Sequence, residues 1–121
     1  MYTSSTLALA ALETLVHFET PEEPEDLVAI AADIPEALEI LSIRAEDLPE
    51  GWTRDPAPVA LADLGTRWAH ERSSPVLAVP SAVIPQELNY LLNPLHAHFK
   101  RIRVGKPEPF RFDPAPALIG H

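Results

Sequence analysis

The hydrophobic residues of this chain follow two different spacings, which together predict both helices and strands. A helix is expected over residues 6–18, because four apolar residues recur there at the i, i+3, i+4 and i+7 spacing of one buried face. Ser4 and Ser5 precede this segment and are expected to cap the helix. The residues of the predicted buried face are Ala8, Ala11, Leu12 and Leu15.

A second helix is expected over residues 59–71. Leu61, Leu64 and Trp68 form one apolar stripe in this segment, so the helix is predicted to pack on a sheet through that stripe. Residues 20–26 are too acidic and too rich in proline to extend the first helix. We therefore expect a solvated connection there.

Short segments rich in apolar and β-branched residues predict the strands. Residues 2–5 read as the end of a strand that runs directly into a helix, as if the chain began in the middle of a domain. Residues 84–94 are expected to be irregular or briefly helical, and residues 113–121 to form a loose tail. The other predicted strands are 27–34, 38–43, 76–80, 101–104 and 110–112, with 76–80 as a central strand.

The composition indicates one domain, residues 1–121, because 46% hydrophobic content is enough to bury a core in a chain of 121 residues. The formal charge of -9 argues against the basic surface that nucleic acids require. The chain has no cysteine, its N-terminus has no basic leader, and its apolar stretches are too short to span a membrane. These features predict a soluble cytoplasmic protein.

Glu13 is the first candidate for chemistry, because it lies in the most apolar part of the first predicted helix. Its carboxylate either reaches solvent along the edge of the helix or lies in a pocket, where burial would give it a role. The sequence alone leaves both interpretations open.

Two further candidates lie near the ends of predicted elements. Ser81 directly follows the strand 76–80, where it either serves a site or caps the next turn. Asn89 lies in a segment of amides and an aromatic residue that either holds a ligand or satisfies its own backbone through turns. No metal site is expected, because His96 and His98 are only two residues apart and no cysteine or suitably spaced carboxylate accompanies them.

Several stretches, taken in order along the chain, resemble the RES domain family of toxins from bacterial toxin-antitoxin pairs. The resemblance runs from Tyr2 to Pro114. Its stretches are Tyr2 to Ser5 followed by Leu9 to His17, Asp47 to Trp52, Val79 to Pro85, Asn89 to Pro94, Ile102 to Val104 and Pro109 to Asp113.

The resemblance implies an α+β fold, with a compact mixed sheet and packed helices, similar to the ADP-ribosyltransferase core of diphtheria-type toxins. It also implies NAD as substrate and cleavage of the nicotinamide-ribose bond through a transition state like an oxocarbenium ion. Glu13 would stabilise that cation, and Ser81 would bind the ribose or orient Glu13. Tyr2 would border the nicotinamide, and Asn89 would also contact the NAD.

The family's arginine is the main departure, since its segment would precede Tyr2 and is absent from this sequence. An N-terminally truncated domain is therefore expected, with an exposed sheet edge that favours self-association. The resemblance further implies an antitoxin partner of the Xre type, with a helix-turn-helix fold. One alternative stays open at this point: a catalytically inert relative that acts as an antitoxin-binding or oligomerisation module.

Overall fold

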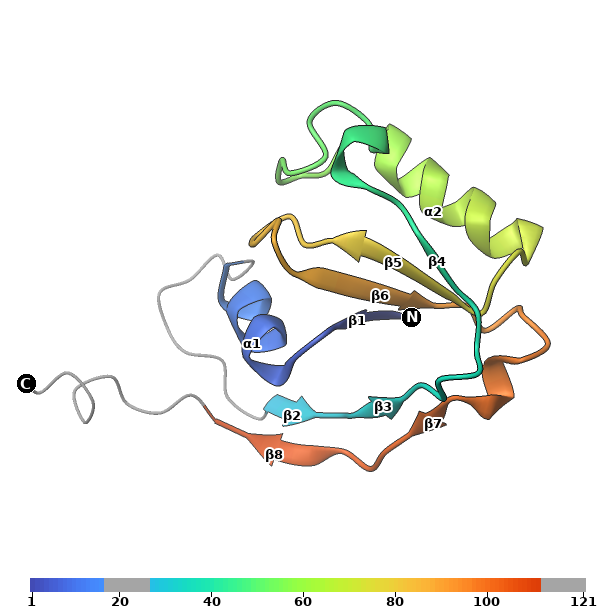
Figure 1. Cartoon of the computed structure of the whole chain (residues 1–121). Helices are drawn as coiled ribbons and strands as arrows, with labels where there is room; N and C mark the ends of the chain where they lie inside the picture. Colours follow the sequence, from blue (N-terminus) through green and yellow to red (C-terminus); the bar gives the residue numbers. More distant parts are fainter. Residues whose placement is uncertain (17–26, 112–121) are drawn as a thin grey trace, which may run out of the picture.

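The computed structural model describes residues 1–16 and 27–111, apart from the side chain of Leu15. Its centre is a four-stranded mixed sheet in the order β1-β6-β5-β4, and Figure 1 shows helices α1 and α2 beside it. Strands β1 and β5 both pair antiparallel with β6, whereas β4 pairs parallel with β5. The strands are β1 (Tyr2–Ser4), β4 (Ile40–Ser42), β5 (Val76–Pro80) and β6 (Leu88–Leu92).

A two-stranded ribbon runs below β1 and α1 in the view of Figure 1. It is built from two antiparallel pairs that follow one another along the chain. One pair joins β2 (Leu27–Ala29) to β8 (Glu108–Phe110), and the other joins β3 (Ala32–Asp33) to β7 (Arg103–Val104). Two short 3-10 helices, η1 (Ala45–Asp47) and η2 (Phe99–Arg101), complete the described elements.

Strand β5 anchors the hydrophobic core, as the apolar run 76–80 predicted. Val76 and Leu92 oppose each other across β5 and β6, and both are fully buried. Leu38 and Ile102 complete this cluster of buried residues, and four partly buried residues pack against it: Ala32, Ile34, Tyr90 and Phe99. A fully buried side chain of this size contributes about 1.5–3 kcal/mol to the stability of the fold.

Helix α2 (Val59–Glu71) has the predicted bounds and forms the crossover between the parallel strands β4 and β5. Trp68 is buried, and Leu61 and Leu64 are partly buried, so the predicted stripe is confirmed. The helix ends at Arg72, which adopts a left-handed conformation with φ of 55°. That conformation turns the chain out of the helix and towards β5.

Helix α1 (Leu7–Val16) is confirmed where it is described, but its predicted cap and buried face are wrong. The Oγ1 atom of Thr6 accepts a hydrogen bond from the backbone N–H of Leu9, at 3.0 Å, so Thr6 caps the helix in place of Ser4 and Ser5. The residues buried on the helix are Leu9 and Glu13, four positions apart. Ala8 and Leu12, which the spacing placed in the core, are exposed. The predicted end at Phe18 lies outside the described residues, as do the connection 20–26 and the tail 113–121.

The predicted strand 27–34 is interrupted, because the two pairs of the ribbon are joined by an irregular stretch. Residues 30–31 on one side face residues 105–107 on the other, so the second side carries one extra residue. The N–H of Gly105 bonds to the carbonyl of Ala31 at 2.7 Å. A Cβ at Gly105 would meet the same oxygen at 3.2 Å, which explains the glycine at this close approach. Lys106 and Pro107 form the rest of the bulge.

The sequence predicts that segment 84–94 is irregular or briefly helical, and this prediction is wrong because the segment contains β6. The pattern of Asn89, Tyr90 and Asn93 has the composition of a turn, but pairing with β5 on one side and β1 on the other holds residues 88–92 extended. Strand β5 has the predicted bounds, β4 and β7 are shorter than predicted, and β8 begins two residues before the predicted strand 110–112. The fold is α+β, with a mixed sheet and two helices in the described part of the chain.

Residues 1–16 and 27–111 contain no helix long and apolar enough to cross a membrane.

Candidate functional site

The alternation of side chains along β1 and β6 builds one polar face at the edge of the sheet. Tyr2 and Ser4 point to the same side of β1, because they are two residues apart, and Ser4 lies opposite Asn89 of β6. Helix α1 follows β1 after two residues and carries Glu13 towards the same side. Ser81 enters from the end of β5.

Glu13 is held at this face by hydrogen bonds from three side chains. Ser81 Oγ donates to Glu13 Oε2 at 2.8 Å, and Asn89 Nδ2 donates to Oε1 at 3.1 Å. Ser4 Oγ also donates to Oε1, in a short hydrogen bond. Glu13 is only 9% exposed, so the interpretation as a solvent-facing residue is wrong. Three donors offset much of the cost of burying the carboxylate.

Ser81 caps the next turn, which is one of the two interpretations that the sequence left open, and it also bonds to Glu13. Its Oγ accepts hydrogen bonds from the N–H groups of Val83 and Ile84, at 3.1 and 3.2 Å, and so caps the turn after β5. The same hydroxyl donates to Glu13. Because Ser81 is fully buried, its only donor is committed to the carboxylate.

Asn89 connects Glu13 to Tyr2 and is not part of a turn. Its Nδ2 donates to Ser4 Oγ, at 3.1 Å, as well as to Glu13. Its Oδ1 accepts a short hydrogen bond from the Tyr2 hydroxyl. Asn89 is fully buried, and these contacts engage both ends of its amide. We refer to Tyr2, Ser4, Glu13, Ser81 and Asn89 as the Glu13 cluster.

The hydroxyl of Tyr2 is shielded although the residue as a whole is 61% exposed. Withdrawal of the hydroxyl from water, followed by the negative charge of Glu13, raises the pKa of Tyr2 to about 12. Both causes disfavour the phenolate. The Tyr2 hydroxyl is therefore a hydrogen-bond donor at neutral pH, directed to Asn89.

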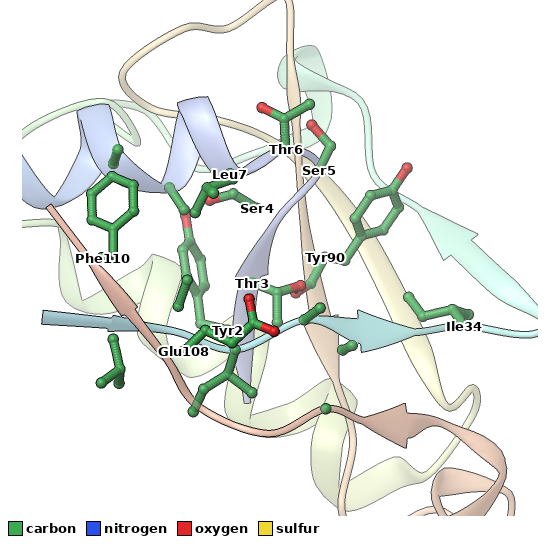
Figure 2. A pocket seen from close by; sticks show the side chains of 18 of the residues that line it. Tyr2, Thr3, Ser4, Ser5, Thr6, Leu7, Ile34, Tyr90, Glu108 and Phe110 are labelled. Carbon is green, nitrogen blue, oxygen red and sulfur yellow. The ribbon is translucent and has the colours of Figure 1, made fainter. Parts of the chain in front are cut away.

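A cavity of about 830 Å³ lies between β1, α1 and the ribbon. Figure 2 shows Tyr2 and Ser4 on its wall near the start of α1, with Thr3 and Tyr90 on another side and Phe110 of β8 across from them. The cavity follows the open edge of β1. Met1 and Ser5 both bond to β6 through their backbones, so Tyr2 and Ser4, which alternate with them, direct their backbone groups away from β6.

Only part of the Glu13 cluster reaches this cavity. Tyr2 and Ser4 line it, whereas Glu13, Ser81 and Asn89 do not. The carboxylate is thus linked to the cavity wall through its hydrogen bond from Ser4. The arrangement can place a fixed negative charge next to a bound molecule while excluding water from that charge.

The structure brings together all four residues singled out from the sequence: Tyr2, Glu13, Ser81 and Asn89. Ser4 is the member that sequence reasoning missed, because it was interpreted as a helix cap. The signal was available in the spacing of Tyr2 and Ser4 on a predicted strand, which places both on one face.

The described residues contain no group of three or more histidine, cysteine or acidic residues able to hold a metal ion. The rings of His96 and His98 lie 5.2 Å apart, and the Nδ1 atom of His96 accepts a hydrogen bond from the backbone N–H of His98 at 3.0 Å. The two histidines are therefore hydrogen-bonded to each other within one turn.

Comparison with known proteins identifies the family. Residues 1–113 match the RES domain. A protein named Toxin Res from Yersinia enterocolitica is 37% identical over 115 residues, which cover 94% of this chain and 75% of that protein. A protein from Sphingobium named Prs ADP-ribosylating toxin is 34% identical over 116 residues, covering 94% of this chain and 72% of its own length. Toxin Res from Photorhabdus laumondii is 34% identical and covers 84% of this chain and 64% of its own. The chain belongs to the RES domain family.

Proposed function

We propose that the protein is the toxin of a toxin-antitoxin pair and that it consumes NAD by cleaving the nicotinamide-ribose bond. The acceptor would be water, phosphate or a protein group. One observation carries the proposal: a buried carboxylate, fixed by three donors, is hydrogen-bonded to Ser4, a residue that lines a cavity. The names of the relatives, which include an ADP-ribosylating toxin, support the same chemistry.

The cavity has suitable dimensions for a dinucleotide. Its volume of about 830 Å³ falls in the range of about 300–1,000 Å³ that is usual for pockets that bind small molecules. Its wall combines apolar residues with the hydroxyls of β1 and the start of α1. Lys106, in the bulge of the ribbon, supplies a cation that could face the diphosphate, although Glu36 and Glu108 also line the cavity. A phosphate group would therefore be expected near Lys106 and away from those two carboxylates.

Glu13 would act through its charge. When the nicotinamide leaves, positive charge develops on the ribose, and a nearby carboxylate stabilises it. The effect is strongest where water is excluded and the charge is already oriented, because no reorganisation is then needed during the reaction. Ser81 and Asn89 would hold the carboxylate from behind, since both are fully buried and neither lines the cavity.

Tyr2 would border the nicotinamide end of the substrate. Its side chain is largely exposed and lines the cavity, while its hydroxyl is tied to Asn89. A ring fixed at its hydroxyl end presents its face at little entropic cost, which favours stacking on a flat heterocycle. In this proposal Tyr2 contacts the substrate, and Asn89 positions Tyr2 and Glu13.

An antitoxin of the Xre type would cover the same region. The cavity is lined by several large apolar residues that are 43–61% exposed, an unusual cluster for a surface in contact with water. Light scattering of the purified chain tests this idea, because a partner-free surface of this kind should promote self-association, and a stable monomer at high concentration would argue against it. The exposed large apolar residues that line the cavity are Tyr2, Leu7, Val28, Ile30 and Ile40.

The decisive experiment measures nicotinamide release from NAD by the purified chain and by Glu13→Gln. The substitution keeps the shape and removes the charge, so we expect cleavage to fall by about 100-fold or more, the loss typical of a removed electrostatic stabiliser. Circular dichroism confirms that the variant is folded. Equal rates for the two proteins would exclude the assigned role of Glu13. Binding of an Xre-type antitoxin without any NAD cleavage would instead favour the inert binding module.

A further inference from the structure

Ser4 occupies the boundary between the buried carboxylate and the cavity. It lines the cavity and is partly exposed, whereas Glu13 is buried and does not line it. Tyr2 is the other member of the Glu13 cluster on the cavity wall, but its hydroxyl bonds to Asn89 and not to Glu13. Ser4 is thus the member that touches both the carboxylate and the cavity.

The hydrogen bonds of Ser4 leave it one free position. A hydroxyl has one donor hydrogen and two acceptor lone pairs. The hydrogen of Ser4 goes to Glu13 Oε1, and one lone pair accepts from Asn89 Nδ2 at 3.1 Å. The second lone pair has no partner among these contacts, and the residue lines the cavity. Ser4 can therefore accept one hydrogen bond from a bound molecule and cannot donate one without releasing Glu13.

The neighbouring hydroxyls are used differently. Thr3 Oγ1 donates to the carbonyl of Tyr90 at 2.8 Å, and Thr6 Oγ1 caps α1. Ser5 is exposed and bonds to β6 through its backbone. Among the four hydroxyl residues from Thr3 to Thr6, Ser4 is the one that donates a hydrogen bond to the carboxylate of Glu13.

We infer that Ser4 Oγ accepts a hydrogen bond from a hydroxyl of the substrate ribose and so transmits the charge of Glu13 to the sugar. This inference rests on the proposed function and specifies how the site grips its substrate. Donation to a carboxylate makes an oxygen a better acceptor, because consecutive hydrogen bonds polarise one another. A ribose hydroxyl, which is a donor, is the group that this acceptor selects. A phosphate oxygen or a ketone oxygen has no hydrogen to give.

The test compares NAD with its two analogues that lack the 2-hydroxyl or the 3-hydroxyl of the nicotinamide ribose. Binding is measured by calorimetry and cleavage by nicotinamide release, for the wild type, Ser4→Ala and Ser4→Thr. Removing one such hydrogen bond should weaken NAD binding or kcat/KM by about tenfold in Ser4→Ala. For one of the two analogues, Ser4→Ala should bind and cleave almost as well as the wild type does, because the hydroxyl that this analogue lacks is the partner of Ser4. Ser4→Thr keeps the hydroxyl and should retain most of the wild-type preference.

A merely structural serine would behave differently. If Ser4→Ala lost the same factor for NAD and for both analogues, the direct contact would be refuted. Ser42→Ala is the matched control, because Ser42 is an exposed serine in β4 outside the cavity and should behave as wild type. Ser4→Cys, with nearly the same shape and a weak acceptor, replaces the alanine variant if that variant melts too early to measure.

The outcomes also separate this inference from the proposed function. NAD binding that depends on Ser4 and on one ribose hydroxyl, without nicotinamide release, would support the contact and refute cleavage. Cleavage that is indifferent to Ser4→Ala would support the function and refute the contact. A wild-type chain that neither binds nor cleaves NAD would overturn both.

Discussion

Two buried polar clusters lie at opposite ends of the paired strands β5 and β6, and they differ in what they surround. The Glu13 cluster gathers at the end of β5 and the start of β6. At the other end, Trp68, Ser74 and Asn93 form a second group, the Trp68 cluster. Both contain fully buried serine and asparagine side chains, so burial and residue type alone do not tell them apart.

The hydrogen-bond partners of the two clusters show the difference. In the Trp68 cluster, Trp68 Nε1 donates to Ser74 Oγ at 3.0 Å, and Ser74 donates to the carbonyl of Val76 at 2.8 Å. Asn93 Nδ2 donates to the carbonyl of Ala69 at 3.1 Å. These bonds end on neutral groups of the backbone and join α2 to the sheet.

In the Glu13 cluster the bonds converge on a carboxylate beside a cavity. Burying a charge costs more desolvation free energy than burying a neutral hydrogen-bonded network. The arrangement around Glu13 is therefore more readily explained by a function than by stability. The comparison teaches that the acceptor at the centre of a polar cluster, and not its burial, separates a structural cluster from a candidate site.

Replacement of Trp68 should have the largest effect on stability. Trp68→Ala removes a buried ring and also the N–H group that donates to Ser74 Oγ. We therefore expect the free energy of unfolding, measured by chemical denaturation, to fall by about 3–5 kcal/mol. Trp68→Phe keeps much of the packing and should lose less. NAD cleavage per folded molecule should be unchanged in the phenylalanine variant. A parallel fall in its activity would show that the two clusters are not separate.

The buried serines that flank β5 provide a matched pair. Ser81→Ala removes a donor to a carboxylate and an acceptor for two N–H groups, so we expect a loss of about 2–3 kcal/mol. Ser74→Ala removes two bonds between neutral groups and should cost about 1–2 kcal/mol. Thermal and chemical unfolding measure both. Nicotinamide release should drop in Ser81→Ala alone, and an equal drop in Ser74→Ala would contradict the comparison.

Much of the fold could be predicted where one physical signal dominates. The bounds of α2 follow from its apolar stripe, and β5 follows from an apolar run too short for a helix. β6 was missed because Asn89, Asn93 and the flanking prolines favoured a loop, whereas pairing with β5 and β1 on both sides makes residues 88–92 a strand. The break in the strand predicted at 27–34 depends on a bulge in the distant segment 105–107, which the local sequence does not reveal.

The sequence and the family resemblance singled out every member of the Glu13 cluster except Ser4, but not the geometry of the cluster. Glu13 and Ser81 are 68 residues apart, and their direct contact could be expected only through the family resemblance. The apolar spacing of α1 pointed away from Glu13, because polar donors and not hydrophobic neighbours make that position favourable for burial. That Ser4 stands between Glu13 and the cavity required coordinates.

The smallest predicted effect concerns pH and the Glu13 cluster alone. The pKa of Tyr2 is raised to about 12, chiefly by burial of its hydroxyl and then by Glu13, compared with about 10 in an unfolded chain. The folded state therefore retains the phenol proton more tightly, and this contribution to stability is complete below about pH 10. It is lost as the pH rises from about 10 towards about 12, where the unfolded state has already released its proton. Wild type should lose stability relative to Tyr2→Phe in this window, as followed by chemical unfolding at a series of pH values. The effect should be modest, because most of the residue is exposed. A difference between the two proteins that stayed constant through the window would show that neither burial nor Glu13 raises the pKa of Tyr2 in the folded state.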